Sequence, residues 1–379
     1  MGVSMKHLSL LILLLQNSTL VLMMRYSRVN VDPDQPMYLA STAVFFAEIV
    51  KLLTCLIILI YKTSSITRTA QIVNKEIIQQ PQEILKMLIP SGLYALQNNL
   101  LYIALSNLEA ATFQVTYQMK ILSTAVFSVM MLNRRLSSQK WFALCLLMVG
   151  VTMVQLQNVG TSRSGSSSGG GSSNISSSIV MAEDDPKDEL ILEEGEILDA
   201  AAVVSENVSE EANQSEEDYF GPVQNPFIGL IAVLTSCVSS GFAGCYFEKI
   251  LKGAEADMWV RSLQLGLSGA LFSFLAMFYD RQRIMEGGLF QGYSIMTWVV
   301  VVNQALGGLL VAVVVKYADN ILKGFATSLS IIISGIISVY FFDFEPSLQF
   351  QFGTMIVILS TYLYGRPEAP IPAFIRPTK

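Results

Sequence analysis

Two lysines lie inside long apolar stretches of the sequence, where a charge is costly. They head similar runs, Lys120-Ile-Leu-Ser-Thr-Ala-Val-Phe and Lys323-Gly-Phe-Ala-Thr-Ser-Leu-Ser, one in each half of the chain. A lysine at the centre of a membrane helix costs roughly 2.5–3.5 kcal/mol, so it usually serves a function. We expect both ammonium groups to hold one anionic group, such as a pyrophosphate. The alternative is an internal ion pair, for which Asp319 is a ready partner of Lys323.

Aromatic, hydroxyl and amide side chains precede Lys120. Tyr117 and Thr116 lie three and four residues before it and therefore share its helical face. Phe113 and the polar break Gln97-Asn98-Asn99 are nearby in the sequence. Together with an ammonium group, these side chains suit the base, ribose and phosphate of a nucleotide. A single aromatic residue such as Phe113 would by itself indicate only packing.

Two further motifs have both a structural and a functional interpretation. Glu48 and Lys51 are three residues apart and can neutralise each other on one helical face. They could form a structural pair or line a cavity, and the sequence favours neither. Ser240 and Gly241 belong to a small-residue run that normally lets helices approach closely. The functional alternative is that these small residues line the bottom of a ligand site.

The composition indicates where these residues must work. Hydrophobic residues make up 52% of the 379 residues, charged residues 14%, and the mean hydropathy is +0.49. A soluble protein has about 25% charged residues, so this chain belongs in a lipid bilayer and is neither a nucleic-acid binder nor a cytosolic enzyme. One histidine, His7, and four cysteines without metal-binding spacing predict no metal site, no cofactor and no catalytic residues.

The apolar runs predict an all-α membrane protein with ten transmembrane helices. A span takes roughly 20 apolar residues. The runs lie at 7–25, 38–61, 85–106, 110–132, 140–157, 225–247, 261–279, 296–315, 319–341 and 348–365. Five spans per half would place the halves in opposite orientations, as two inverted five-helix repeats. The predicted divisions are a first repeat at 1–157, a disordered acidic Ser/Gly-rich lumenal loop at 158–224, a second repeat at 225–365 and a cytosolic tail at 366–379.

Charge and sequons orient the predicted spans. With both termini on one side, that side collects 15 lysines and arginines and the other side 6, which predicts cytosolic N- and C-termini. The segment 158–222 has a net charge of −13, which leaves +7 on the rest of the chain. It also carries glycosylation sequons at Asn174, Asn207 and Asn213, as expected for a lumenal loop.

Several long motifs resemble those of the eukaryotic nucleotide-sugar transporters of the drug/metabolite transporter superfamily. The resemblance covers nearly the whole chain except the central loop and the last residues. The matching runs are Leu96-Gln-Asn-Asn-Leu, Thr112-Phe-Gln-Val-Thr-Tyr-Gln-Met-Lys-Ile-Leu, Ser239-Ser-Gly-Phe-Ala-Gly, Tyr246-Phe-Glu-Lys-Ile-Leu-Lys-Gly and Lys316-Tyr-Ala-Asp-Asn-Ile-Leu-Lys-Gly-Phe-Ala-Thr-Ser-Leu-Ser. The resemblance is stronger for the UDP-galactose and UDP-N-acetylglucosamine branches of the family than for the CMP-sialic acid branch.

The resemblance implies a Golgi membrane protein of ten helices that exchanges a nucleotide sugar for a nucleoside monophosphate. The ligand-contacting positions of the family fall here on Asn98, Phe113, Tyr117, Lys120, Ser240, Gly241, Ser262 and Lys323. Two of them depart from the common pattern: Phe113 is often tyrosine in relatives, and Ser262 is usually asparagine. Gly266 resembles the UDP-hexose members, whereas the sialic acid transporters are bulkier there.

These features together predict an antiporter of a UDP-sugar and UMP. UDP-galactose is the expected cargo, and UDP-N-acetylglucosamine and UDP-N-acetylgalactosamine are alternatives within the same class. The rivals are a CMP-sialic acid/CMP exchanger, a nucleotide-sugar-dependent membrane enzyme and a non-transporting membrane scaffold. The expected partners are the UDP-sugar, UMP and the lipid bilayer. Association with a second copy or with a glycosyltransferase stays open.

Deleting the central loop separates a transporter from a scaffold. The segment Ser162–Glu217 has too little apolar surface to fold by itself. We therefore expect a variant without it to retain the transport rate of the intact chain in liposomes. Loss of transport from a folded deletion variant would favour a function carried by the loop.

Overall fold

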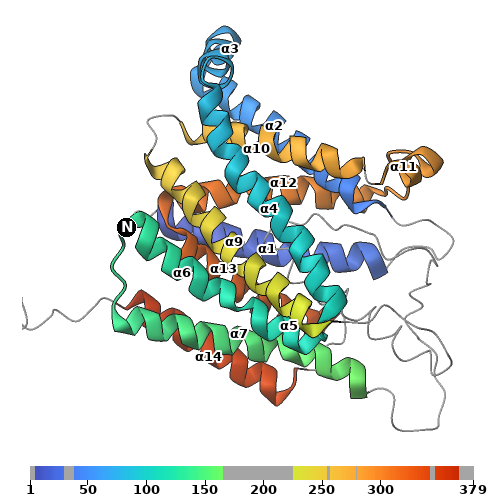
Figure 1. Ribbon diagram of the computed structural model, residues 1–379, viewed down its shortest axis with the longest axis vertical. Helices are drawn as coiled ribbons and strands as arrows, with labels where there is room; N and C mark the ends of the chain where they lie inside the picture. The colour runs from blue at the N-terminus through green and yellow to red at the C-terminus, as the bar shows by residue number, and fades with distance from the viewer. Residues whose placement is uncertain are drawn as a thin grey trace, which may run out of the picture.

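The computed structural model describes residues 5–29, 38–164, 225–253, 257–278, 280–341 and 346–366. Within these ranges every regular element is a helix, which confirms the all-α class (Figure 1). The helices are α1 (Met5–Val29), α2 (Ala40–Thr63), α3 (Ile66–Val73), the π-helix η1 (Asn74–Ile78), α4 (Pro81–Asn107), α5 (Ala110–Tyr117), α6 (Met119–Leu132), α7 (Ser138–Ser164), α9 (Pro226–Gly253), α10 (Met258–Met277), α11 (Arg281–Gly287), α12 (Ile295–Tyr317), α13 (Asn320–Phe341) and α14 (Leu348–Gly365).

Eight segments among the described residues are long and apolar enough to cross a membrane. They correspond to α1, α2, the combined α5–α6 segment, α7, α9, α10, α12 and α13. α4 contains the polar Gln97-Asn98-Asn99 break, and α14 has only 18 residues, two of them glutamines. The ten predicted spans therefore stay a prediction at these two helices. The three sequons and most of the acidic loop lie outside the described residues.

Two structural details lie between or within the predicted spans. Residues 66–78, between the predicted spans at 38–61 and 85–106, form α3 and η1. Ile72, Val73 and Ile77 pack there against a buried cluster that draws on α2, α10 and α12, and this burial of apolar side chains stabilises the segment. The predicted span at 110–132 corresponds to one apolar segment of membrane-spanning length, Ala111–Leu132, which has a local irregularity at Gln118 between α5 and α6.

Helix pairing follows the same pattern in both halves of the chain. The α7–α14 and α2–α10 pairs are both extensive, and each joins equivalent helices of the two halves. α4 packs on α9 as α12 packs on α1, and α6 packs on α9 as α13 packs on α1. An exchange of the two halves leaves this set of pairs unchanged. The pattern is what a two-fold relation between repeats predicts, and the inverted repeat itself stays a prediction.

Contacts along α9 give the relative directions of its neighbours. Asn107 and Leu108 near the end of α4 lie beside Gly229 near the start of α9, and Met87 near the start of α4 clusters with Phe247 near the end of α9. α4 and α9 are therefore antiparallel. α6 and α9 are parallel, because Ser123 bonds to Cys237 and Ser128 to Cys245. The ends of α6 and α9 thus lie at one end of the bundle, with the start of α13.

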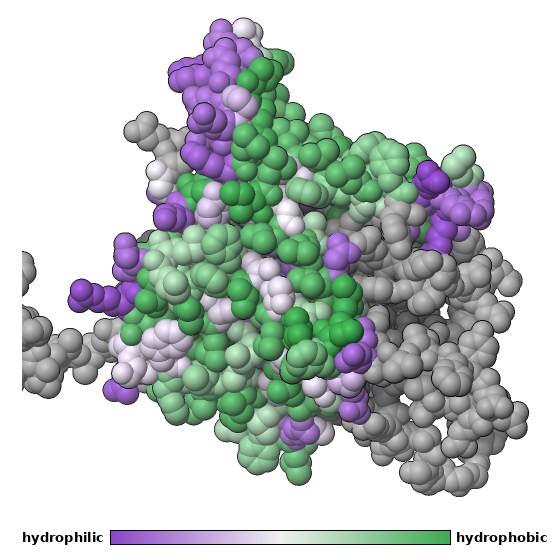
Figure 2. All heavy atoms as spheres, in the orientation of Figure 1, coloured by the Kyte–Doolittle hydropathy of each residue, from purple (hydrophilic) through white to green (hydrophobic). Residues whose placement is uncertain are grey.

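The surface has the polarity expected of a protein in a bilayer. Figure 2 shows the visible face mostly apolar, with hydrophilic residues gathered over α3, over α11 and along the edge where α6 ends. Large apolar side chains such as Ile57, Met130 and Phe227 are more than half exposed. Such side chains would be unfavourable in water, so the lateral surface is suited to lipid.

Glycines bring α7 and α14 into close contact. A Cβ on Gly353 would lie 2.9 Å from the carbonyl oxygen of Gly150 and 2.9 Å from the backbone nitrogen of Val154. A Cβ on Gly150 would lie 3.0 Å from the backbone nitrogen of Val357. Because the obstructing atoms belong to the backbone, a side chain at either position forces the two helices apart.

A substitution at this crossing tests the packing of α7 on α14. We expect Gly353→Ala to cost about 1–3 kcal/mol through overpacking and to lower the melting temperature of the detergent-solubilised protein. Gly365→Ala is the matched control at the end of the same helix, because its Cβ would meet nothing within 4 Å. Equal melting temperatures for the two variants would contradict this packing.

Candidate functional site

Phe113, Tyr117 and Lys120 form one continuous stack. The two rings are nearly parallel, with centroids 5.5 Å apart and planes at 12°. The Lys120 ammonium lies over the Tyr117 ring, with Nζ 4.3 Å from the ring centroid. This is a cation–π contact, and it is stronger away from water. The predicted proximity of Tyr117 and Lys120 is confirmed by this contact. It joins the last residue of α5 to the second residue of α6.

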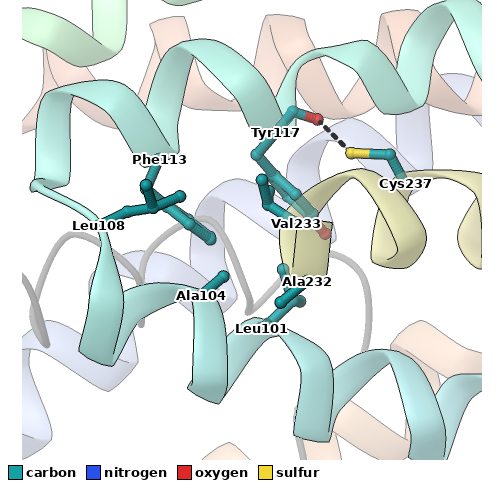
Figure 3. Close-up of a cluster of buried hydrophobic side chains, with 8 residues drawn as sticks. All are labelled: Leu101, Ala104, Leu108, Phe113, Tyr117, Ala232, Val233 and Cys237. Atoms are coloured by element: carbon teal, nitrogen blue, oxygen red, sulfur yellow. Dashed lines mark hydrogen bonds between the residues drawn. The ribbon is translucent and has the colours of Figure 1, made fainter. Parts of the chain in front are cut away.

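The aromatic rings are packed inside the bundle. Phe113 and Tyr117 are both fully buried. Figure 3 shows them between α4 and α9, where they cluster with Leu101, Ala104 and Val233. In this state the two rings therefore have a packing role. Stacking a nucleotide base on either ring requires this part of the bundle to open.

The interruption at Gln118 places Lys120 at the start of a new helix. Tyr117 is the last residue of α5, and Lys120 is the second residue of α6. The Gln118 amide donates to Oε1 of Gln155 on α7 at 2.5 Å, which fixes the joint from the other side. Gln118 keeps right-handed helical dihedral angles, φ −64° and ψ −14°, so the break is a local irregularity within one apolar segment.

α9 forms the neighbouring wall of the stack. Sγ of Cys237 donates to the Tyr117 carbonyl at 3.4 Å, and Ser123 of α6 donates to the Cys237 carbonyl at 2.6 Å. One turn further along α9, Ser240 and Gly241 are buried. A Cβ on Gly241 would lie 2.6 Å from Oγ of Ser123 and 2.8 Å from the Thr124 backbone nitrogen. Gly241 therefore allows α6 and α9 to approach closely, which is the structural role of small residues.

Buried amides near the stack have polar atoms that the described residues do not satisfy. Both side-chain polar atoms of Gln97 on α4 lack a hydrogen-bond partner there, and the side chain is 1% exposed. Oε1 of Gln114 on α5 also lacks a hydrogen-bond partner among the described residues. An unsatisfied buried polar group costs about 1–3 kcal/mol, so a water molecule or a ligand is a natural partner. Asn98, the predicted site residue next to Gln97, has no described side chain.

Lys323 lies in the first turn of α13, next to α6. Its backbone N–H donates to the Asp319 carbonyl at 3.0 Å. The neighbouring Ile321 and Phe325 belong to the same buried cluster as Ala125 of α6. The Asp319 carboxylate, which the sequence offered as a partner for Lys323, binds Nη1 of Arg134 at 2.8 Å.

The remaining predicted residues lie between α2 and α10. Nζ of Lys51 is 2.6 Å from Oε1 of Glu48, and both side chains are buried. A Cβ on Gly266 would lie 3.0 Å from Leu52 and 3.8 Å from Oε2 of Glu48. A bulky residue at 266 would therefore press on the helix that carries the ion pair. Oγ of Ser262, one turn earlier, is buried without a hydrogen-bond partner in the described structure.

The structure thus divides the predicted residues into two groups. Phe113, Tyr117 and Lys120 stack together beside α9, and Glu48, Lys51 and Gly266 meet between α2 and α10. The sequence reading missed a buried carboxylate, Glu248, which binds Arg134 at 2.7 Å. A glutamate within an apolar helix is a signal for a functional group, and it could have been used here.

Substituting one or both members of the buried pair tests its contribution to stability. Replacing Glu48 with leucine removes the carboxylate beside Lys51, and the loss of one partner of a buried pair costs about 3–5 kcal/mol. We expect Glu48→Leu to lower the melting temperature, and Glu48→Leu/Lys51→Met to restore most of it. A double variant as unstable as the single variant would show that the two charges do not act as a pair.

Comparisons with known proteins identify the family of the chain. The profile of a family described as nucleotide-sugar transporter matches residues 1–365. A UDP-N-acetylglucosamine transporter of Bos taurus is 46% identical over 374 residues, which cover 98% of each chain. The human protein of that description is 45% identical with the same coverage. A UDP-galactose translocator of Mus musculus is 42% identical over 371 residues, or 97% of this chain and 80% of its own. The chain belongs to the nucleotide-sugar transporter family.

Proposed function

We propose that the protein is an antiporter that brings a UDP-sugar from the cytosol into the Golgi lumen and returns UMP. The observation that carries this proposal is the stack of Phe113, Tyr117 and Lys120 at the joint between α5 and α6. It combines two buried aromatic rings with a partly buried ammonium group inside an apolar segment of membrane-spanning length. Few cargoes use both features, and a nucleotide, with its base and its phosphate, is one of them.

Lys120 and Lys323 hold the phosphates in this proposal. They belong to the equivalent helices α6 and α13, which contact each other. A UDP-sugar and UMP share the base, the ribose and one phosphate, so one site can bind both. Two ammonium groups in a closed, water-poor site are costly without an anion. Closure is therefore favoured with either cargo bound, which is the physical basis of exchange.

The relatives support a UDP-sugar as the proposed cargo. Those at 45–46% identity are UDP-N-acetylglucosamine transporters, and those at 42–43% are UDP-galactose translocators. The proposal therefore places UDP-N-acetylglucosamine beside UDP-galactose, the cargo expected from the sequence, and makes both the first cargoes to test. Gly266 supports this choice over CMP-sialic acid, since a bulkier residue there would press on Leu52.

The charge distribution supports the proposed orientation. Lys62, Arg134, Lys252 and Lys316 lie near the ends of α2, α6, α9 and α12, and the contacts place these ends together. An excess of lysine and arginine is typical of cytosolic loops. We therefore propose that this end, with both termini, faces the cytosol.

Counterflow in liposomes tests the function and the two lysines together. We expect vesicles preloaded with UMP to take up an external UDP-sugar and empty vesicles not to. Lys120→Ala and Lys323→Ala should each lower the rate roughly 10- to 100-fold, the loss expected for one charge-assisted bond to phosphate. Labelled UDP-N-acetylglucosamine, UDP-galactose, UDP-N-acetylgalactosamine and CMP-sialic acid would be offered separately.

The control is Lys75→Ala, which removes an exposed lysine of η1 and should exchange at the wild-type rate. Normal exchange by folded Lys120→Ala and Lys323→Ala variants would remove the assigned role of the lysines. No uptake of any nucleotide sugar by the folded wild-type protein would remove the transport proposal and favour the enzyme and scaffold alternatives.

A further inference from the structure

A fully buried carboxylate lies outside the candidate site, near the end of α9. Oε1 of Glu248 accepts from Nη2 of Arg134 at 2.7 Å and from Nζ of Lys252 at 2.7 Å. Oε2 accepts from the backbone N–H of Asn320 at 3.0 Å. The side chain is 0% exposed. A buried carboxylate is tolerated only when it is paired and hydrogen-bonded, and Glu248 has both kinds of partner here.

Arg134 connects this carboxylate to a second one. It lies in the segment between α6 and α7, and its Nη1 is 2.8 Å from Oδ2 of Asp319. Burial alone would lower the pKa of the Arg134 guanidinium, but Asp319 and Glu248 raise it above its ordinary value. Arg134 comes from the first half of the chain, whereas Glu248 and Asp319 come from the second. The guanidinium therefore ties the two halves together at one end of the bundle.

The same contacts fix the helix turn that carries Lys323. Oδ1 of Asp319 accepts from the Leu322 backbone N–H at 2.7 Å, and the Asp319 carbonyl accepts from that of Lys323 at 3.0 Å. Glu248 holds the backbone N–H of Asn320. The first turn of α13 is thus anchored to α9 and, through Arg134, to the end of α6.

The second half of the chain can keep its own charges satisfied if Arg134 leaves. Lys252 lies four residues after Glu248 on α9, and its Nζ also donates to the Ala318 carbonyl at 2.6 Å. Glu248 would therefore retain a cation and Asp319 its helix-capping bond. The Arg134 side chain is 29% exposed, so water can solvate the guanidinium as it moves away. Release would not leave a bare charge in the interior, which removes the usual penalty for breaking a buried pair.

We propose that Arg134 is a latch that holds this end of the bundle closed and positions the first turn of α13, and that it must release for the end to open. The proposal rests on the alternating-access transport proposed above. It assigns to Arg134 a positioning role, since it acts on Lys323 through Asp319 and the α13 backbone. Lys252 keeps Glu248 paired in the open state.

Cys245 reports the opening independently of transport. It lies on α9 one turn before Glu248, is fully buried, and bonds through Sγ to the Thr124 carbonyl at 3.4 Å and to Ser128 Oγ at 3.3 Å, both of α6. A maleimide can reach Cys245 from this end only when α6 and α9 separate. The labelling rate at this residue, read by peptide mass spectrometry on the purified full-length protein, therefore measures the open population.

We expect Arg134→Gln to raise the labelling rate of Cys245 by about tenfold or more, since loss of a partly buried ion pair shifts an open–closed equilibrium by at least this factor. Arg134→Lys should lie between this variant and the wild type, because one ammonium cannot hold two carboxylates in the forked geometry of a guanidinium. Arg135→Gln is the matched control: Arg135 is the exposed neighbour in the same segment, and its variant should label as the wild type does.

An unchanged labelling rate in folded Arg134→Gln, or an equal increase in Arg135→Gln, would overturn the latch. If Arg134→Gln does not fold, Asp319→Asn replaces it, because asparagine keeps an oxygen for the helix cap and weakens only the bond to Arg134. This variant should also raise the labelling rate, and an unchanged rate would count against the latch. Counterflow measured on the same samples separates the two proposals. Absence of exchange by the wild-type protein would contradict the transport function. The labelling rate of Cys245 tests the latch role of Arg134 separately.

Discussion

The cost of a charge inside a bilayer is the constraint on which the rest of the structure depends. A transporter of an anion needs cationic groups at membrane depth, and each of them must be held by neighbouring groups. Lys120 lies over the Tyr117 ring, and Lys51 binds Glu48. At the end of the bundle, Arg134 and Lys252 share Glu248. The charges of the described core therefore lie in contacts that are local, specific and sensitive to helix position.

Close helix contacts make these charge contacts sensitive to movement. Gly241 allows α9 to lie against α6. A Cβ on Gly269 of α10 would lie only 2.8 Å from Oε2 of Glu48 on α2. A small shift of either helix would therefore break a polar contact. The pair α4–α9 has a counterpart in the pair α12–α1. A movement of one pair therefore has an equivalent movement of the other. This arrangement suits a bundle that alternates between two states.

The sequence predicts local features well and long-range contacts poorly. Apolar runs predict most helices, and the spacing of Tyr117 and Lys120 predicts their contact, because both depend on residues close in the chain. The hydrogen bond between Gln118 and Gln155 joins residues of two different helices. The contact of Arg134 with Glu248 joins residues 114 positions apart in the sequence. The need for glycine at position 241 arises only from its closeness to Ser123 on another helix. No local pattern contains this information. The burial of Phe113 depends on α4 and α9 in the same way.

The proposed exchange depends on two lysines, Lys120 and Lys323, that recognise a phosphate shared by both cargoes. The most direct measurement compares the binding of UMP and uridine to the purified protein by calorimetry, since the two ligands differ only in the phosphate. We expect UMP to bind at least about 100-fold more tightly, and Lys120→Ala/Lys323→Ala to remove most of that difference. Equal affinities of the wild-type protein for UMP and uridine would contradict this recognition, because Lys120 and Lys323 would then contribute nothing to phosphate binding.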